Sequence, residues 1–559
     1  MPRNRSSSSL DRRQFISTTV AVGAAFLTGC TRTERPAPTT PDIPCADTSP
    51  TPQPGIELLE LTISDLQGRL GNGQETSRSL VEKYMARIDA LNFRGLELRA
   101  VLELNPDALD IAEQLDRERA AKGPRGALHG IPILLKDNID TADKTTTTAG
   151  SLALSGSIAT KDSTVAARLR EAGAILLGKT NMSEWANFRS SHSSSGWSSR
   201  GGQCRNPYVL DRTPSGSSSG SGVAVAASFA AAAIGTETDG SIISPSACCS
   251  LVGIKPTLGL VSRAGLIPIS PNQDTAGPMA RTVMDAAILL GVLVGADPPD
   301  PASAPGAQFG QRDYTRTLGK RSLQGLRIGV MRNDLYGKNG KVDAVFDAAL
   351  KDLKFLGMEL VDPADVPSIA DRWPLEKEAL LHEFKPALEG YLASLSERAP
   401  IKTLKDLIAW NDKHHDEAMP FFDQDLLIEA EKRGDLTNKA YLDVRDKLRD
   451  LAKTRGLDAL LDGQKLDALV APTGCLPWPI DLAGGDNETF SAASPPAIAG
   501  YPHITVPAGY CLGLPTGISF IGKPWSEPLL LDIAYAYEQA TKARRAPRYL
   551  PSMETTLRR

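Results

Sequence analysis

The sequence predicts an α/β fold, in which a β-sheet is packed between helices. Short apolar segments at residues 131–135, 174–178 and 327–331 have the length and composition of buried strands. Between such segments, apolar residues recur at the spacing of an amphipathic helix, as in residues 77–92. Because strands that alternate with helices pack in layers, we expect a sheet that is covered by helices.

Three segments carry the helix predictions in detail. The helix at residues 77–92, with Thr76 or Ser77 as its N-cap, places these apolar side chains on one face: Leu80, Val81, Tyr84, Met85, Ile88 and Leu91. A second helical spacing of apolar residues runs from Val342 to Leu356. The Ala-rich segment from Val223 to Ile234 predicts a short, tightly packed helix, and its length excludes a membrane span.

The second half of the chain adds further elements and bounds the class of protein. Late strands are expected at residues 468–470 and 517–521, and the charged, helix-prone residues 370–450 predict a helical excursion.

A hydrophobic content of 41% and a formal net charge of −4 describe a soluble globular protein with a large core. The chain has no basic stripe that would indicate nucleic-acid binding. Its length alone suggests two or more domains.

Residues 1–30 have the features of an export signal. The pair Arg12 and Arg13 precedes a short apolar run, a pattern typical of a twin-arginine signal and too short for a spanning helix. The run ends in LTGC at residues 27–30, which resembles a bacterial lipoprotein cleavage site in which Cys30 becomes the lipidated first residue. Residues 31–55 are rich in Pro and Thr and predict a tether. We expect an exported, periplasmic or extracytoplasmic protein that reaches the membrane only through this lipid; the alternative is an uncleaved anchor.

The remaining cysteines do not form a disulfide framework. They are scattered along the chain at Cys45, Cys204, Cys248, Cys249, Cys475 and Cys511. The adjacent Cys248 and Cys249 are poorly placed to pair with each other. We therefore expect mostly free, buried thiols.

Two loops of small residues carry the main chemical signal. Residues 216–222 read GSSSGSG and residues 235–241 read GTETDGS, and Lys136 closes the apolar run that precedes both loops. Amide hydrolysis needs a nucleophile, a base and donors for the developing oxyanion. Glycines allow backbone N–H groups to approach a substrate closely. The loops could therefore supply serine nucleophiles and an oxyanion site, whereas the alternative for the first loop alone is a flexible linker.

Other hydrolase mechanisms fit these serines less well. Gly216, Ser218 and Gly220 match the nucleophile elbow of α/β-hydrolases, but the preceding residues 205–214 are polar and interrupted twice by Pro rather than forming a strand. No lysine has a serine three residues before it, as penicillin-recognising enzymes require. Six histidines lack the spacing of zinc ligands: His129, His192, His382, His414, His415 and His503.

Lysine as the base remains, and this role has a physical requirement. A free lysine with a pKa of about 10.4 must shift by roughly three units, worth about 4 kcal/mol, to act as a base near neutral pH. Burial lowers the pKa of an amine. Lys136, at the end of an apolar run, fits a buried strand that delivers one amine to its carboxyl edge, although a lysine in this position is commonly a surface residue.

In this order, the lysine and the two serine loops resemble the amidase signature family, which hydrolyses amides with a Ser-cis-Ser-Lys triad. Further matching segments bring the resemblance to most of residues 56–550: KTNMSEW at 179–185, VGIKPT at 252–257, APT at 471–473 and AGYPHITVP at 499–507. The resemblance implies one amidase domain over residues 56–559 with a mixed central sheet in an α/β/α sandwich. It also implies that the helical excursion shapes the substrate entrance, and that no metal or organic cofactor takes part.

The resemblance also assigns roles within the two loops. Ser241 matches the nucleophile that forms the acyl-enzyme, Ser217 the serine that follows a cis peptide bond and relays the proton, and Lys136 the base. Ser218 matches a supporting serine. The oxyanion hole would consist of backbone N–H groups of Thr238, Asp239, Gly240 and Ser241. Ser215, Ser219 and Asp239 stand where many relatives have Gly, which leaves the triad intact.

Within the family, the sequence is similar to that of the peptide amidase branch, whose members remove C-terminal amides of peptides. The segments that carry this similarity are residues 193–197, 235–241 and 478–479. Asp239, Ser191, Ser194 and the surroundings of Trp478 could then hold the substrate. The unusual residues 246–250 (SACCS) put the details of that wall in doubt.

Three alternatives remain open: an amidase for aryl or other small amides, a subunit of a glutamine amidotransferase, and a substrate-binding lipoprotein. The export signal argues against the amidotransferase, which works in a cytosolic complex with tRNA. The presence of Lys136, Ser217 and Ser241 argues against a binding protein, which needs no nucleophile. The oligomeric state is not indicated by the sequence.

Overall fold

The computed structural model describes residues 55–311, 313–366, 372–395, 399 and 401–553. The predicted export signal, Cys30 and all but the last residue of the predicted tether lie outside these ranges. From Pro52 onward the chain forms one compact unit. Within the described ranges, no helix is both long and apolar enough to cross a membrane.

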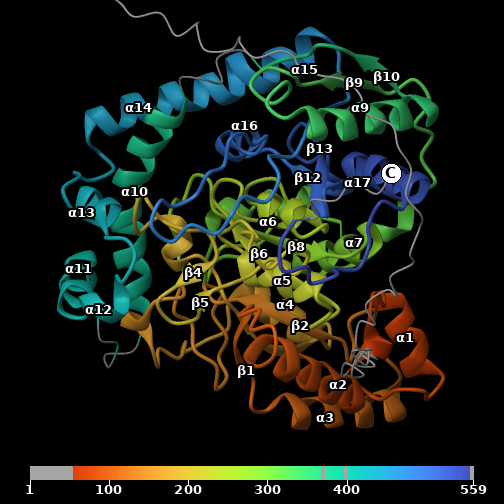
Figure 1. The fold of residues 1–559 in the computed structure, drawn as a ribbon, viewed down its shortest axis with the longest axis vertical. Coiled ribbons are helices and arrows are strands. Elements are labelled where there is room, and N and C mark those ends of the chain that lie inside the picture. The colour runs from red at the N-terminus through yellow and green to blue at the C-terminus, as the bar shows by residue number, and fades with distance from the viewer. Residues whose placement is uncertain (1–54, 312, 367–371, 396–398, 400, 554–559) are drawn as a thin grey trace, which may run out of the picture. The chain divides into compact units, whose positions relative to one another are not determined.

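The centre of this unit is a mixed sheet of eleven strands in the order β1, β3, β2, β6, β8, β7, β12, β13, β11, β9 and β10 (Figure 1). β2 runs parallel to its neighbours β3 and β6, and β9 runs parallel to β10 and β11. The other neighbouring pairs are antiparallel. The strands are β1 (Val101–Leu104), β2 (Pro132–Lys136), β3 (Ile175–Thr180), β6 (Ala232–Glu237), β7 (Val252–Lys255), β8 (Thr275–Ala280), β9 (Arg327–Val330), β10 (Glu359–Val361), β11 (Ala468–Pro472), β12 (His503–Cys511) and β13 (Leu514–Ile521). A separate two-stranded sheet joins β4 (Trp197–Ser198) and β5 (Gly202–Gln203).

Helices flank the sheet, as expected for the predicted α/β/α architecture. In the first half of the chain these are α1 (Ile63–Gly71), α2 (Ser77–Ile88), α3 (Ala108–Lys122), α4 (Thr164–Glu171), α5 (Ser219–Ala226), α6 (Ile243–Cys248), α7 (Val283–Leu293), α8 (Gly306–Phe309) and α9 (Gly340–Phe355). In the second half they are α10 (Arg372–Ser394), α11 (Leu404–Lys413), α12 (His415–Ala418), α13 (Asp425–Glu431), α14 (Lys439–Arg449), α15 (Ala459–Gly463), α16 (Ser494–Ala499) and α17 (Glu527–Thr541). α5 and α6 pack against each other and against central strands, while α7 packs against α4 and α17.

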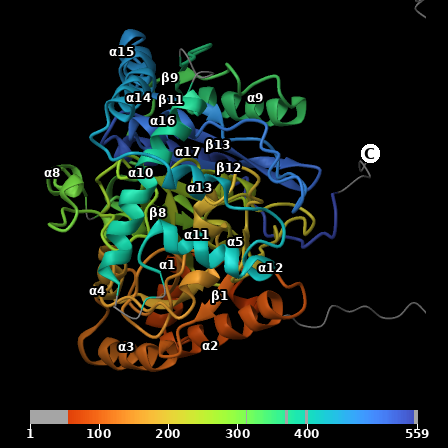
Figure 2. The ribbon, with the colours of Figure 1, turned by 90° about the vertical axis from the view of Figure 1, so that its left-hand side faces the viewer.

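The helices α10 to α14 occupy the region for which a helical excursion was expected. They lie together on one side of the molecule, where Figure 2 shows α10, α11 and α13 facing the viewer. α10 contacts α11, α13 and α14, and Phe384 on α10 contacts Phe188 from the loop after β3 with ring centroids 5.1 Å apart. The excursion therefore has a small core of its own that adjoins the loops at the sheet edge.

Local sequence signals placed most of the predicted elements correctly. The five predicted strands correspond to β2, β3, β9, β11 and β13, and two predicted helices correspond to α2 and α9. α2 starts after Thr76, whose hydroxyl accepts a hydrogen bond from the Ser79 N–H at 3.0 Å, as the N-cap prediction requires.

The predicted helix from Val223 to Ile234 is wrong after Ala226. α5 ends at Ala226, and β6 begins at Ala232. Ser228, with φ of 56°, lies in the left-handed region and turns the chain between the two elements. Residues 232–237 pair with β2 on one side and β8 on the other, so sheet hydrogen bonds outweigh the helix propensity of alanine.

The cysteines of the described residues are free, as the sequence predicts. Four of them are buried (Cys204, Cys248, Cys249 and Cys511), and Cys475 is half-buried. Burial raises the pKa of each of these thiols. They therefore behave as small apolar side chains of the core.

Candidate functional site

Lys136 is the last residue of β2 and is fully buried. Its amine donates hydrogen bonds to Ser217 Oγ at 2.8 Å, Thr236 Oγ1 at 2.9 Å and the Thr236 carbonyl at 3.1 Å. Burial lowers the pKa of Lys136 to about 7, and the charges of Glu237 and Asp274 act in the opposite direction. A substantial fraction of the amine is therefore neutral near pH 7, which meets the physical requirement for a lysine base.

Ser217 follows a cis peptide bond, Gly216-Ser217, and is fully buried. The resemblance implied a cis bond at this position. The next residue, Ser218, connects the loop to its surroundings: its hydroxyl donates to the Thr236 carbonyl at 3.0 Å and accepts from the Thr236 N–H at 3.2 Å. The Ser218 N–H donates to the Ser241 carbonyl at 3.2 Å. Ser218 thus ties the first serine loop to β6 and to the second serine loop, which agrees with a supporting role.

Ser241 lies four residues beyond the end of β6 and lines a cavity of about 510 Å³. Thr238, Asp239 and Gly240 line the same cavity. Gly240 has a φ of 75°, a conformation that favours glycine and turns the chain just before Ser241. Within the described residues, the backbone N–H groups of residues 238–241 donate no hydrogen bond to another protein group. These four groups are therefore available to a ligand in the cavity.

The turn at residues 238–241 is held by side chains from the loop before β8. Thr238 donates from its hydroxyl to Asp274 Oδ1 at 2.6 Å, and Gln273 Nε2 donates to the Thr238 carbonyl at 3.2 Å. Asp274 also accepts the N–H groups of Ile269 and Ser270, at 2.8 and 2.9 Å. The turn is therefore held by contacts that do not use the N–H groups of residues 238–241.

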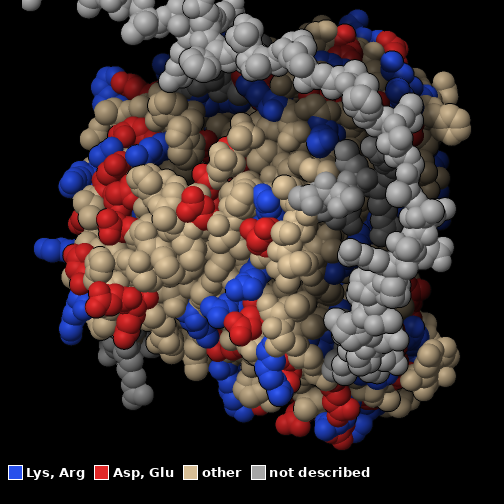
Figure 3. Space-filling view, viewed as in Figure 1, with Lys and Arg blue, Asp and Glu red and all other residues tan. Residues whose placement is uncertain are grey.

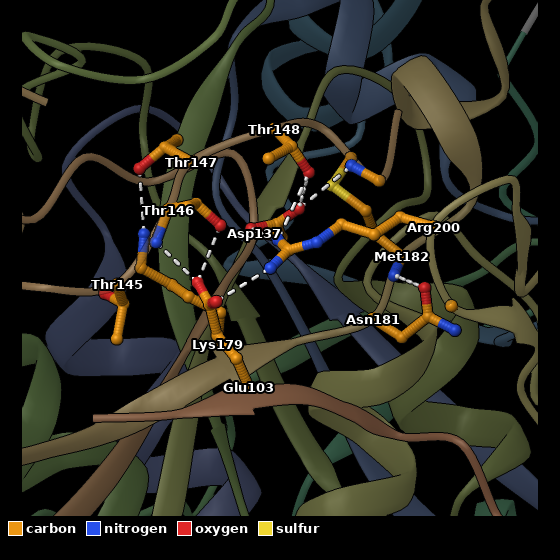
Figure 4. Close-up of polar contacts among 12 residues, drawn as sticks. Glu103, Asp137, Thr145, Thr146, Thr147, Thr148, Lys179, Asn181, Met182 and Arg200 are labelled. Atoms are coloured by element: carbon orange, nitrogen blue, oxygen red, sulfur yellow. Dashed lines mark hydrogen bonds and ion pairs between the residues drawn. The ribbon is translucent and has the colours of Figure 1, made fainter. Parts of the chain in front are cut away.

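A second polar network fixes the residue that follows Lys136. Figure 4 shows Arg200 between Asp137 and Glu103: its guanidinium nitrogens lie 3.2 Å from Asp137 Oδ1 and 2.8 Å from Glu103 Oε2. The Thr148 hydroxyl donates to Asp137, as does the Gly150 N–H at 3.0 Å. Lys179, a second buried lysine that Figure 4 shows beside this network, donates to Thr147 Oγ1 at 2.9 Å, and neither residue lines the cavity. This network anchors the chain directly after the end of β2.

The cavity has walls of different character. Apolar side chains form one part of the lining: Phe188, Ile269, Trp373, Leu380, Leu426 and Trp478. Carboxyl groups from three segments form another: Asp239, Glu376, Asp486 and Glu488. α10 and α13 of the helical excursion contribute Trp373, Glu376, Lys377, Leu380 and Leu426. The excursion thus shapes the cavity, as the resemblance implied.

The carboxyl groups of this lining have raised pKa values. Desolvation, together with the neighbouring Asp486 and Asp239, raises the pKa of Glu488 to about 7. Burial also raises the pKa values of Asp239 and Glu376, which are hydrogen-bonded to each other and so favour sharing a proton. Lys377, the one basic side chain of the described lining, is paired with Glu429 at 3.1 Å. The cavity wall therefore gathers four carboxyl groups around one paired lysine, and its negative charge grows as the pH rises through their raised pKa values.

The residues expected to hold a substrate are partly at the cavity. Asp239, Ser191 and Trp478 line it, whereas Ser194 is buried and does not.

Thr236 and Asn138 also belong to the site, although the sequence assigned no role to either. Asn138 Nδ2 donates to Thr236 Oγ1 at 3.0 Å. The sequence indicated these two residues only through their neighbours: Thr236 lies in the predicted loop at residues 235–241, and Asn138 lies two residues after Lys136. In the described part of the chain, no group of three His, Cys, Asp or Glu side chains is arranged to hold a metal ion.

Sequence comparisons give consistent results. The family model described as Amidase matches residues 79–531. A probable amidase from Arabidopsis thaliana is 42% identical over 504 residues, covering 89% of this chain and 93% of the relative. A glutamyl-tRNA(Gln) amidotransferase subunit from Chloroflexus aurantiacus is 35% identical over 499 residues, covering 87% of this chain and 98% of the relative.

Solved structures agree with the sequence comparisons. A peptide amidase in complex with the competitive inhibitor chymostatin has 49% sequence identity and a TM-score of 0.85, with 88% of this chain and 100% of that chain covered. The native peptide amidase from Stenotrophomonas maltophilia has 49% identity and a TM-score of 0.83, with 88% and 99% covered. This chain therefore belongs to the amidase signature family and is an enzyme that hydrolyses amide bonds.

Proposed function

We propose that this enzyme hydrolyses terminal carboxamides, in particular the C-terminal amides of peptides or amino acids, to a carboxylic acid and ammonia. The observation that carries the mechanism is the hydrogen bond from the Lys136 amine to Ser217 Oγ at 2.8 Å, in a buried site directly behind a cavity lined by Ser241. The similarity to solved peptide amidases supports the substrate class.

In the proposed reaction, Ser241 Oγ attacks the carbonyl carbon of the amide while its proton passes through Ser217 to neutral Lys136. The oxyanion of the tetrahedral intermediate accepts hydrogen bonds from the N–H groups of residues 238–241. The C–N bond then breaks, and the proton returns from Lys136 to the leaving nitrogen, which departs as ammonia. Water attacks the acyl-enzyme by the same route and releases the acid and free Ser241. No step requires a metal or an organic cofactor.

Two features of the cavity favour a peptide amide over other amides. Serine hydroxyls and the side chain of Asp239 offer hydrogen bonds to a peptide backbone, and the apolar part of the lining can hold one side chain. The volume of about 510 Å³ suits a short peptide end. The amidotransferase relatives give glutamine as the second candidate substrate.

The test is ammonia release from a peptide amide, glutamine, an aryl amide and a fatty amide, measured as kcat/KM with the wild-type enzyme and with Ser241→Ala. We expect the peptide amide to react fastest, internal peptide bonds to be spared, and Ser241→Ala to lower turnover by several orders of magnitude with the fold intact. Turnover near the wild-type value in Ser241→Ala would end the proposed mechanism. Preference for the aryl or fatty amide would leave the amidase chemistry and remove the peptide assignment.

We also propose that the enzyme is exported through its twin-arginine signal and is tethered by a lipid on Cys30. The support is the sequence of residues 1–30 alone, since these residues lie outside the described ranges. An exported enzyme would act on amides outside the cytoplasm, away from the tRNA complexes of amidotransferases.

A further inference from the structure

Glu237, the last residue of β6, contacts the segment that follows Ser241. Its Oε2 atom accepts the N–H groups of Ile242 at 2.8 Å and Ile243 at 3.0 Å, and the side chain is only 1% exposed. A carboxylate that accepts two backbone N–H groups is a strong, charge-assisted anchor. The position of Ser241 relative to β6 is therefore fixed by a side chain that does not itself line the cavity of about 510 Å³.

The residue before Glu237 holds the other end of the site. Thr236 accepts two hydrogen bonds from the Lys136 amine, through its hydroxyl and its carbonyl group. Because successive side chains of a strand point to opposite faces, Thr236 and Glu237 reach in different directions from the same strand end. This dipeptide therefore joins the segment of the candidate nucleophile to the candidate base.

Charged groups from several elements surround Glu237. Lys136 on β2 and Lys255 on β7 are both buried amines that interact with its charge, and Asp239 acts on it as a like charge. Asp274 also acts on Lys136, while Glu527 on α17 and His503 on β12 face Lys255. Burial raises the pKa of Glu237, whereas Lys255 and the two N–H donors favour its ionised form. For Lys136, the charge of Glu237 raises the pKa against the larger effect of burial.

We propose that Glu237 is a positioning residue: its carboxylate anchors the backbone behind Ser241, at the end of the strand whose preceding residue, Thr236, holds the Lys136 amine. This inference rests on the proposed function, in which Ser241 is the nucleophile and Lys136 the base. It assigns to Glu237 an effect on the pH dependence that a purely structural side chain would not have.

The test is the pH profile of kcat/KM from pH 5 to 9 for Glu237→Gln, a substitution of nearly the same shape without the charge. Gln keeps a carbonyl oxygen that can accept the two N–H groups but lacks the charge that strengthens these bonds, so Ser241 is held less firmly and kcat should fall on the order of 10- to 100-fold. Loss of the negative charge makes protonated Lys136 less stable. The acid limb of the profile, the pH range in which kcat/KM falls as Lys136 gains a proton, should therefore move to lower pH by roughly 0.5 to 1 unit. Glu237→Asp keeps the charge but is too short to reach both N–H groups, so kcat should fall while the acid limb stays near its wild-type position.

The matched control is Asp285→Asn. Asp285 is also a buried carboxylate that accepts a backbone N–H at the start of a helix, from Ile63 at 3.0 Å, and like Glu237 it does not line the cavity. It differs in belonging to α7 rather than to the end of β6. This variant should lose thermal stability and keep the wild-type pH profile.

The outcomes separate this inference from the proposed function. If Lys136→Ala and Ser241→Ala are inactive but Glu237→Gln keeps the wild-type acid limb, or moves it to higher pH, the role of Glu237 is wrong and the mechanism stands. If Lys136→Ala retains activity, the proposed mechanism itself is wrong. Should Glu237→Gln fail to fold, an unchanged kcat in Glu237→Asp would overturn the anchoring role.

Discussion

At the scale of single residues, the environment of Lys136 distinguishes it from the other buried lysines. Its amine is bonded to two hydroxyl groups and a carbonyl group, and in the described part of the chain no carboxylate lies within ion-pair distance of it. Neutral acceptors do not penalise loss of the proton as a paired carboxylate would. Lys179 is equally buried, but it contacts Thr147 and the Ile139 carbonyl rather than a serine next to the cavity. Among the buried lysines of the described residues, only Lys136 combines a lowered pKa with a hydrogen bond to a serine of the two loops.

The lowered pKa of Lys136 leads to a prediction of pH dependence. Since the free enzyme needs the neutral amine, kcat/KM should fall as the pH drops below about 7, with about a tenfold loss per pH unit. In an unperturbed lysine, the same decline would begin near pH 10. The profile is measured with a peptide amide under conditions in which chemistry limits the rate, shown by a solvent isotope effect. A flat profile from pH 5 to 9 would contradict lysine as the base.

At the scale of secondary-structure elements, the site depends on where strands end. β2 delivers Lys136 and β6 delivers Thr236 and Glu237 at neighbouring strand ends, because the two strands are parallel and paired in register from Ile133 with Ala232. α10 and the loop after Trp478 then close the cavity with Glu376, Asp486 and Glu488. The candidate base thus comes from a strand end and the candidate serines from loops that adjoin β6 and α5, whereas much of the cavity wall comes from the excursion and from a late loop.

The acidic wall predicts a charge preference. At pH 8, where Glu488 with its pKa of about 7 is ionised, an N-acetylated lysine amide should have a kcat/KM roughly three- to tenfold higher than that of the glutamic acid α-amide. At pH 6 the difference should shrink, because Glu488 gains a proton. Glu488→Gln should reduce the difference at pH 8, whereas Asp423→Asn, an exposed neighbour of the excursion, should not. Equal discrimination in wild type and Glu488→Gln would show that this carboxylate does not select the substrate.

At the scale of the whole molecule, acidic and basic side chains are intermixed on the face seen in Figure 3, around a broad area without charge. This face has no continuous basic area of the kind that binds nucleic acid. The described compact unit holds the candidate site, whereas the proposed export and lipid anchor rest on the sequence of residues 1–30.

The predicted lipid anchor is tested on the native protein. We expect mature protein purified from membranes to begin at Cys30 and to carry a lipid, as determined by mass spectrometry of the N-terminal peptide. Cys30→Ser should leave the enzyme in the soluble fraction with its activity unchanged, because the cavity lies in a different part of the chain. Mature protein cut at another residue, or soluble protein that still begins at Met1, would exclude the anchor.

The sequence by itself identified the family, the α/β class and the residues that meet at the site. Ser217 and Ser241 were predicted from two short, glycine-rich loops, and Lys136 from its place at the end of the continuously apolar β2. The tertiary structure decided what depends on distant partners. β8 contains Gly277 and Pro278 and gives no strand signal, yet it pairs with β6 and β7. Likewise, the end of the predicted helix at residues 223–234 forms part of β6, because β2 and β8 on either side supply hydrogen bonds. Glu237 anchors the segment after Ser241 because the chain turns back after β6 and brings the Ile242 N–H to its carboxylate.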